Sequence, residues 1–199
     1  MIAIVDYGMG NLRSVQKALE SVGAKTKITQ SQDDILKAEK IVLPGVGAFA
    51  VAIKKLESLN LINPLKKAVN SNKPFLGICL GLQLLFTESQ EARGINGLDI
   101  FKGTVKKFKR LKVPHIGWNQ IKINPDNSKL FKGIDDRANM YFCHSFYVEP
   151  KDKNIIAATT DYGMDFVSAV SQGNIFGVQF HPEKSQKVGL KILENFKKE

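Results

Sequence analysis

The chain is poor in the features that mark secreted and membrane proteins. Its 199 residues contain only two cysteines, and the apolar opening at residues 1–5 stops at Asp6. This opening is too short for a signal peptide or a membrane span, and no basic leader precedes it. We therefore expect a cytoplasmic protein without membrane contact, in which Cys79 and Cys143 are both reduced.

Arginine is also scarce, although the chain is strongly basic. Lysine and arginine number 29 against 19 aspartates and glutamates, a net charge of +10, yet only four are arginines. Base reading and bidentate phosphate contacts favour the planar guanidinium group, so we expect no nucleic-acid partner. The densest basic cluster suits a solvated loop or an acidic partner, and we favour the solvated loop. This cluster comprises Lys106, Lys107, Lys109, Arg110 and Lys112.

No stretch rich in proline, glycine or serine divides the chain, so we expect one domain, residues 1–199. Short apolar runs alternate with helical patterns in the first half. Strands are expected at residues 2–5, 40–43 and 74–78, and helices at residues 12–22 and between the last two strands. This order is typical of a parallel α/β sheet flanked by helices.

The second half of the chain has many short strands and few helices. Strands are expected at residues 105–108, 120–123, 140–147, 155–159, 166–171 and 175–180. Gly173 and Asn174 suit a tight hairpin turn between the last two strands, and residues 184–196 suit a closing helix. We therefore predict a mixed, mostly parallel α/β sheet with an added antiparallel portion.

Glycines flank a cysteine in the segment Gly77-Ile78-Cys79-Leu80-Gly81. Residues 74–78 are expected to form a strand and residues 80–86 a buried helix, so Cys79 lies at the turn between them. The glycines leave room for a strained turn, and the positive end of the helix dipole favours the thiolate. The pattern predicts a nucleophile elbow with cysteine in place of serine. The alternative, a buried structural cysteine, does not explain the paired glycines.

A nucleophilic thiol needs a base, and the sequence holds three histidines, His115, His144 and His181. His181 follows an apolar run, precedes a proline and stands two residues before Glu183. In an extended segment these two side chains share a face, so Glu183 can orient the imidazole while its other nitrogen accepts a proton from Cys79. The alternative is a histidine–carboxylate pair that only stabilises the end of a strand.

An acyl-transfer site also needs donors for the developing oxyanion. The backbone N–H of Leu80, at the start of the expected helix, offers one donor. Residues 44–47, Pro-Gly-Val-Gly, follow a predicted strand at the edge where ligands bind in open parallel sheets, and they can offer a second donor. By itself this segment also suits a plain strand-to-helix turn.

These motifs resemble those of the class I, or triad-type, glutamine amidotransferases over nearly the whole chain. The resemblance rests on residues 77–83 as the elbow and on His181-Pro182-Glu183 as the rest of the triad. It implies a flavodoxin-like fold and an enzyme in which Cys79 attacks the side-chain amide of glutamine. Ammonia would leave, and water would hydrolyse the remaining γ-glutamyl thioester. His181 would shuttle the protons, and neither a cofactor nor a metal is expected.

The same resemblance assigns the residues around the substrate. Backbone N–H groups would stabilise the oxyanion, and a glutamine side chain together with a three-residue segment would hold the bound glutamine. The residues with these roles are Val46, Gly47, Leu80, Gln83, His144, Ser145 and Phe146. The family more often has tyrosine at the last of these positions, so Phe146 removes only a hydroxyl contact. His144 would then belong to the substrate segment and not act as a general base.

Four segments, beginning at Asp6, Pro44, Pro114 and His181, resemble the branch of this family that serves a cyclase subunit in histidine biosynthesis. The resemblance implies a heterodimer with a (β/α)8 barrel. That barrel would use the ammonia to make imidazole glycerol phosphate and aminoimidazole carboxamide ribonucleotide. A more acidic partner would also use part of the positive charge for steering. The expected interface residues are Asn11, Trp118, Tyr141 and Lys184.

Other interpretations stay open at this point. The glutaminase subunit of another synthase, such as pyridoxal phosphate synthase, usually has a Gly-Gly-Glu-Ser type of turn where this chain has residues 44–47. A non-catalytic binding module of the same fold would be expected to lack Cys79, His181 or Glu183. A cysteine peptidase is disfavoured because no secretion signal or pro-segment is recognisable. At the expected interface, Trp118 and Tyr141 also suit core packing.

Overall fold

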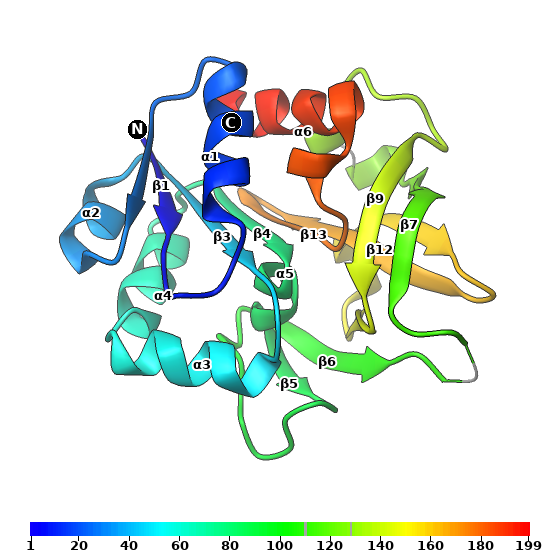
Figure 1. The fold of residues 1–199 in the computed structure, drawn as a ribbon, viewed down its shortest axis with the longest axis horizontal. Coiled ribbons are helices and arrows are strands. Elements are labelled where there is room, and N and C mark those ends of the chain that lie inside the picture. Colours follow the sequence, from blue (N-terminus) through cyan, green and yellow to red (C-terminus); the bar gives the residue numbers. More distant parts are fainter. Residues whose placement is uncertain (110, 128) are drawn as a thin grey trace.

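The structure, a computed structural model, describes residues 1–109, 111–127 and 129–199 (Figure 1). Arg110 of the basic cluster therefore lies outside the described residues. Within these ranges, no helix is long and apolar enough to cross a membrane.

Helices and strands alternate along the first half of the chain, and strands dominate the second half. The α-helices are α1 (Leu12–Ser21), α2 (Gln32–Lys37), α3 (Phe49–Ser58), α4 (Ile62–Asn70), α5 (Leu80–Leu84) and α6 (Gln186–Lys198). The strands are β1 (Ile2–Val5), β2 (Thr26–Thr29), β3 (Lys40–Gly45), β4 (Phe75–Cys79), β5 (Phe86–Ser89), β6 (Phe101–Lys107), β7 (His115–Gln120), β8 (Lys122–Ile123), β9 (Asn139–His144), β10 (Phe146–Pro150), β11 (Ile156–Asp161), β12 (Asp165–Gln172) and β13 (Ile175–Val178). Short 3-10 helices are η1 (Pro125–Asn127), η2 (Lys129–Phe131), η3 (Lys153–Ile155) and η4 (Pro182–Lys184).

The parallel part of the main sheet has the strand order β2-β1-β3-β4-β13. Every residue of β1 and β4 is buried, as expected for strands that helices cover on both faces. The predicted parallel α/β arrangement of the first half is confirmed. The last strand, β13, inserts beside β4, with Val178 opposite Ile78. This pairing brings the residues that follow β13 next to the expected elbow at Cys79.

The other part of the main sheet is mostly antiparallel, as predicted. Strands β12, β10 and β6 follow β13 in antiparallel pairs, and β5 closes the sheet parallel to β6. Strands β11 and β8 branch from β12. Gly173 has a φ of +59° in the turn between β12 and β13, so the predicted hairpin is confirmed.

Some predicted element boundaries are wrong. The run at residues 140–147 is two strands: β9 pairs with β7 in a separate two-stranded sheet, whereas β10 joins the main sheet beside β6. Ser145 separates them. The run at residues 120–123 is likewise divided between β7 and β8. The helix expected at residues 80–86 ends at Leu84, because Phe86 opens β5. Strand β2 and helix α2 were not predicted.

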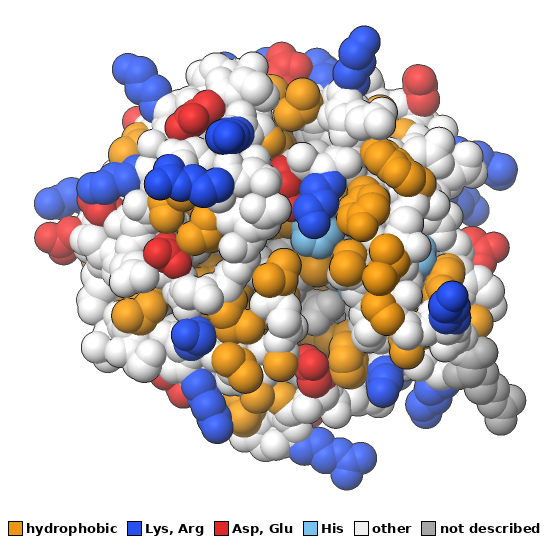
Figure 2. Space-filling view, in the orientation of Figure 1, with side chains coloured by type: hydrophobic (Ala, Val, Ile, Leu, Met, Phe, Trp, Pro, Cys, Tyr) orange, Lys and Arg blue, Asp and Glu red, His pale blue; other side chains and the backbone are white. Residues whose placement is uncertain are grey.

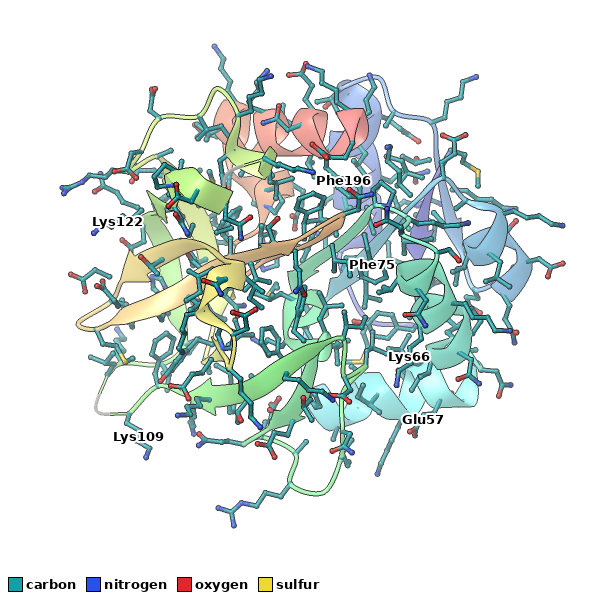
Figure 3. All side chains as sticks on the ribbon, turned by 180° about the vertical axis from the view of Figure 1, so that it is seen from behind. Glu57, Lys66, Phe75, Lys109, Lys122 and Phe196 are labelled. Carbon is teal, nitrogen blue, oxygen red and sulfur yellow. The ribbon has the colours of Figure 1, made fainter. Side chains whose placement is uncertain are left out.

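Two hydrophobic clusters cover the two faces of the main sheet. One contains apolar residues of α3, α4 and α5, and the other contains those of α1 and α6. Figure 1 shows these two groups of helices on either side of the sheet, with α1 and α6 side by side at the top. Phe75 of β4 belongs to the first cluster and Phe196 of α6 to the second, and both are labelled in Figure 3.

Candidate active site

Cys79 occupies a strained turn between β4 and α5. It has a φ of 55° and a ψ of −108°, a conformation that residues other than glycine rarely adopt. The glycines on either side are needed because the chain segments approach closely. A Cβ atom on Gly81 would lie 1.8 Å from the carbonyl oxygen of Leu43, and one on Gly77 would lie 2.7 Å from the carbonyl oxygen of Gly81. The turn therefore has the geometry expected of a nucleophile elbow.

His181 and Glu183 form a buried pair beside this turn. The Nδ1 atom of His181 lies 2.8 Å from Oε1 of Glu183, and their side chains are only 4% and 1% exposed. If Nδ1 carries the donated proton, Nε2 is left free as an acceptor. Burial lowers the pKa of His181, but its interactions with Cys79 and then Glu183 outweigh burial and raise that pKa to about 10. The three residues thus form one electrostatically coupled group.

A cavity of about 270 Å³ opens in front of Cys79 and His181. All seven residues predicted around the substrate line it. The lining residues are Val46, Gly47, Cys79, Leu80, Gln83, Glu91, Pro114, Cys143, His144, Ser145, Phe146, His181 and Lys184. Glu91, Pro114 and Cys143 were not predicted there. The sequence carries no local signal for them, because their approach to Cys79 depends on the folding of distant segments.

The segment after β3 brings the expected oxyanion donors to the elbow. Gly45 lies opposite Cys79 in the pairing of β3 with β4, and Val46 and Gly47 follow at the rim of the cavity. Gly47 has a φ of +96°, which glycine adopts at little cost. On the other side, Leu80 begins α5 directly after Cys79. The backbone of both segments therefore borders the space above the sulfur.

The segment at residues 144–146 is held by a chain of hydrogen bonds. The carbonyl oxygen of Phe146 accepts from Nδ1 of His144 at 2.7 Å and from Nε2 of Gln83 at 3.2 Å. The other nitrogen of His144 lies 3.1 Å from Nδ1 of His115. Burial lowers the pKa of His144 to about 3, so this imidazole is neutral near neutral pH. Its protonation state and its contacts are those of a structural residue.

Gln179 was not predicted from the sequence, yet it contacts the expected nucleophile directly. Its side-chain Nε2 lies 3.6 Å from Sγ of Cys79, and its Oε1 accepts from Nε2 of Gln83 at 3.1 Å. The residue is completely buried. A glutamine at the end of an apolar run gave no sign of this contact, because Cys79 is 100 positions away in the sequence.

Three of the four expected interface residues lie together beside the cavity. Trp118 of β7 stands opposite Tyr141 of β9, with their ring centres 6.0 Å apart. The Nζ atom of Lys184 lies 5.5 Å from the centre of the Tyr141 ring, a cation–π arrangement. Asn11 belongs to a different element and is exposed at the N-terminal end of α1.

Exposed apolar side chains gather around the same opening. Figure 2 shows hydrophobic side chains in the middle of this face, with lysines and arginines mostly around its margin. Most of the large apolar residues that are exposed come from two segments, residues 46–51 and 113–118, and each segment also contributes to the cavity. They are Val46, Val51, Val113, Ile116 and Trp118.

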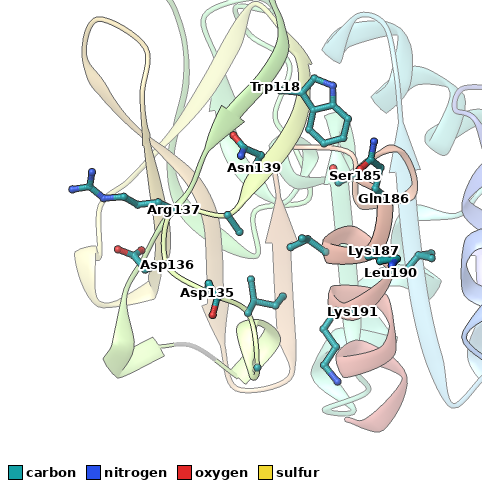
Figure 4. Close-up of a pocket in the computed structure, with 14 residues that line it drawn as sticks. Trp118, Asp135, Asp136, Arg137, Asn139, Ser185, Gln186, Lys187, Leu190 and Lys191 are labelled. Carbon is teal, nitrogen blue, oxygen red and sulfur yellow. The ribbon is translucent and has the colours of Figure 1, made fainter.

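A larger hollow of about 1240 Å³ lies between α6 and the segment before β9 (Figure 4). Trp118, Asp135, Arg137 and Lys191 are among its lining residues, whereas Cys79, His181 and Glu183 are not. Although this hollow is larger, it holds none of the three proposed catalytic residues and is therefore not the candidate active site. Among the described residues, no group of three or more His, Cys, Asp or Glu side chains is arranged to hold a metal ion. Cys79 and Cys143 are both free thiols, as expected.

The chain belongs to the class I glutamine amidotransferases, because the family model "Glutamine amidotransferase class-I" matches residues 3–199. Solved structures of low sequence identity share the fold. One titled "Crystal structure of glutamine amidotransferase" has a TM-score of 0.78 at 18% identity and covers 98% of this chain and 99% of that one. Another, titled "Structure of PurLQS from Thermotoga maritima", has a TM-score of 0.77 at 21% identity and covers 98% of this chain and 96% of that one.

Curated relatives narrow the family to one branch. Three of them, each about half identical to this chain, are named imidazole glycerol phosphate synthase subunit HisH. The Pyrococcus furiosus protein is 53% identical, covering 99% of this chain and 98% of that one. The Methanocaldococcus jannaschii protein is 51% identical, covering 98% of each chain. The Syntrophotalea carbinolica protein is 50% identical, again covering 98% of each. The family and branch predicted from the motifs are thereby confirmed.

Proposed function

We infer that the chain is the glutaminase subunit of imidazole glycerol phosphate synthase in histidine biosynthesis, where it hydrolyses glutamine and works with a cyclase subunit. The observation that carries this conclusion is that Cys79 and His181 line one cavity, while Glu183 contacts the Nδ1 atom of His181 at 2.8 Å. The three residues come from two distant parts of the chain and supply a nucleophile, a base and an orienting carboxylate. The branch that serves a cyclase is also favoured over pyridoxal phosphate synthase by the names of the relatives.

In the proposed reaction, His181 accepts the thiol proton and the Cys79 thiolate attacks the side-chain carbonyl carbon of glutamine. Backbone N–H groups of Leu80 and of the Val46–Gly47 segment donate to the oxyanion that forms. The His181 imidazolium then protonates the leaving nitrogen, and ammonia departs from a γ-glutamyl thioester. Water attacks the thioester with His181 as base, which releases glutamate and returns the thiol.

Glu183 keeps the imidazole in position during both steps. Its carboxylate accepts from Nδ1 at 2.8 Å, which directs Nε2 towards the sulfur and stabilises the imidazolium that forms when the thiol loses its proton. Gln83 and residues 144–146 form the wall of the cavity and hold the substrate. Both N–H bonds of the Gln83 amide are directed to protein acceptors, so its Oε1 is the atom left to accept from glutamine.

The ammonia passes to a cyclase subunit with a (β/α)8 barrel that forms a heterodimer with this chain in the cytoplasm. The exposed apolar segments at residues 46–51 and 113–118 support a partner surface around the cavity, because apolar patches of this kind mark interaction sites. Trp118, Tyr141 and Lys184 lie at its centre, and Lys184 also lines the cavity. Asn11 completes the proposed interface from α1.

Replacing the nucleophile tests this function. We expect Cys79→Ala to fold and to bind the cyclase, but to release no glutamate from glutamine, with or without the cyclase and its ribonucleotide substrate. Cys143→Ser is the matched control, because Cys143 is an exposed thiol beside the same cavity and its backbone carbonyl is retained. The control should keep its glutaminase turnover. Glutamate formation by Cys79→Ala would refute the assignment.

A further inference from the structure

Gln179 places a polar side chain against the proposed nucleophile in a fully buried setting. It follows β13, and its backbone N–H donates to the carbonyl oxygen of Ser168 at 2.9 Å, which holds its main chain. The side-chain amide reaches Sγ of Cys79 at 3.6 Å. This distance suits an N–H···S hydrogen bond, since sulfur is larger than oxygen.

The orientation of the Gln179 amide follows from a fixed acceptor. The carbonyl oxygen of Phe146 belongs to the main chain and can only accept, so the side-chain nitrogen of Gln83 must face it. The same nitrogen has a second N–H, which points to Gln179 at 3.1 Å and requires an oxygen there. The Gln179 nitrogen must then face Cys79. The opposite orientation would set two donors against each other and a carbonyl oxygen against the sulfur.

We propose that Gln179 is a further catalytic residue, whose side-chain N–H donates to the Cys79 sulfur and stabilises its thiolate form. The proposal rests on the function inferred above. A hydrogen bond to a buried anion is much stronger than one to a neutral acceptor. The amide therefore favours the thiolate, both as the nucleophile that attacks glutamine and as the group that leaves when the thioester is hydrolysed. In the thioester the sulfur is neutral, and the same contact is weaker.

Because the site is buried, a polar amide at position 179 indicates that its hydrogen bonds are needed there. An apolar side chain of the same size could fill the space, whereas a buried amide costs free energy unless its groups are paired. One N–H and the oxygen of Gln179 are paired within the site itself, with Cys79 and Gln83. The ionisable groups around the sulfur or lining the cavity are His181, Glu183, Tyr7, His144, Glu91, Lys184 and Cys143. Only Cys143 is replaced in the test, and it is replaced in every protein compared.

The test measures the pH dependence of Cys79 alkylation by iodoacetamide in the full-length chain, followed by mass spectrometry. Every protein carries Cys143→Ser, so that only Cys79 reports. Gln179→Met lacks the N–H donor but keeps the length of the side chain. For this variant we expect the midpoint of the pH profile of Cys79 alkylation to move upward by about one pH unit. For Gln179→Glu, a carboxylate replaces the donor beside the sulfur, so the upward movement should be larger. Glutaminase turnover in the complex with the cyclase should fall in both variants.

Asn195→Leu is the control for loss of a buried amide. The Asn195 side chain is also buried and donates to the carbonyl oxygens of Leu130 and Lys132, away from the cavity. The midpoint of Cys79 alkylation in Asn195→Leu should equal that of the protein with Gln179 and Asn195 intact. An unchanged midpoint in the Gln179 variants, with reduced turnover, would overturn the proposal and leave a packing role. Gln179→Glu keeps the size and the acceptor for Gln83, so it decides the question if Gln179→Met does not fold. Failure of the proposed function would instead show as glutamate release by Cys79→Ala.

Discussion

His181 and His144 both border the cavity, yet their surroundings drive their protonation in opposite directions. Burial lowers the pKa of each imidazole. At His181 the interactions with Cys79 and Glu183 outweigh burial and raise the pKa to about 10. His144 faces His115 and a backbone carbonyl instead, and its pKa falls to about 3. One imidazole is therefore suited to carry a proton, and the other supports the structure in its neutral form.

The roles proposed for His181 and Glu183 predict unequal effects of two substitutions. We expect His181→Ala to lower kcat for glutamine hydrolysis by about a thousandfold or more, because the proton carrier of both steps is lost. Glu183→Gln keeps an oxygen to accept from Nδ1 and loses only the charge, so kcat should fall less. Both are measured as glutamate release by the complex at saturating glutamine. A larger loss for Glu183→Gln would contradict the orienting role of the carboxylate.

The depressed pKa of His144 predicts a loss of stability in mild acid. The unfolded chain binds a proton at this residue near its ordinary pKa of about 6.5, whereas the folded chain does so only near about 3. Because the unfolded state then binds more protons, the free energy of unfolding should fall as the pH drops from about 6.5 to about 5. Burial lowers the pKa of His115 in the same direction.

Urea unfolding at a series of pH values measures this effect. The variant His144→Asn removes the titrating group and keeps an amide that can donate to Phe146. It should be less stable than the unchanged protein near neutral pH and should show a flatter pH dependence in the same range. An equal slope for both proteins would mean that other groups cause the acid sensitivity.

At the scale of secondary-structure elements, the site depends on how closely α5 approaches β3. Gly81 has no room for a side chain, because its Cβ would lie 1.8 Å from the carbonyl oxygen of Leu43. The nearest atoms that this Cβ would meet belong to the main chain of Leu43, and they cannot rotate out of the way as a flexible side chain can. The position of α5 relative to β3 also sets the space between the Leu80 N–H and the Val46–Gly47 segment, where the oxyanion would form.

We therefore expect Gly81→Ala to lower the free energy of unfolding by roughly 3 kcal/mol and to abolish glutaminase turnover, because α5 must move away from β3. Gly94→Ala is a suitable control, since Gly94 is exposed with a φ of +79° and nothing lies within 4 Å of an added Cβ. It should cost about 1–2 kcal/mol from backbone strain alone and should keep its turnover. Urea unfolding and glutamate assays compare the two. Similar turnover in both variants would refute the requirement for close packing.

At the scale of the whole molecule, exposed apolar side chains flank the cavity beside Cys79. The rings of Trp118 and Tyr141 and the ammonium group of Lys184 form one contact chain, and Lys184 reaches the cavity wall. Trp118 remains 49% exposed, although aromatic side chains of this size usually gain by burial. A partner seated here would bury the tryptophan and shield the departing ammonia from solvent.

Truncating Trp118, the proposed anchor of the interface, should weaken the complex with the cyclase. We expect Trp118→Ala to raise the Kd for the cyclase at least about tenfold, because a few buried aromatic residues often supply most of the binding free energy of a protein–protein interface. Leu36→Ala is the control, because Leu36 is an exposed apolar residue on α2, outside the segments that flank the cavity. Isothermal titration calorimetry with the cyclase compares the two. Equal affinities would place the interface elsewhere.

Local patterns explain which parts of the fold were predictable. Buried parallel strands such as β1 and β4 are continuous apolar runs, so they stand out in the sequence. The division of residues 140–147 does not, because nearly every residue of that run favours a strand, and only distant partners, β7 and β6, separate β9 from β10. The edge strand β2, Thr26–Thr29, has a single large apolar residue and gave no such signal.

The sequence alone determined the local geometry that depends on neighbours in the chain. The glycines around Cys79 predicted the elbow, and the spacing of His181 and Glu183 predicted their contact, although the 3-10 helix η4 and not the expected extended segment brings Glu183 to the imidazole. Tertiary structure decided what meets across the sheet. It set β13 beside β4, so that a glutamine 100 positions from Cys79 reaches its sulfur. Pairing between strands that lie far apart in the chain, such as β13 with β4, depends on the packing of the whole core, and no local pattern encodes it.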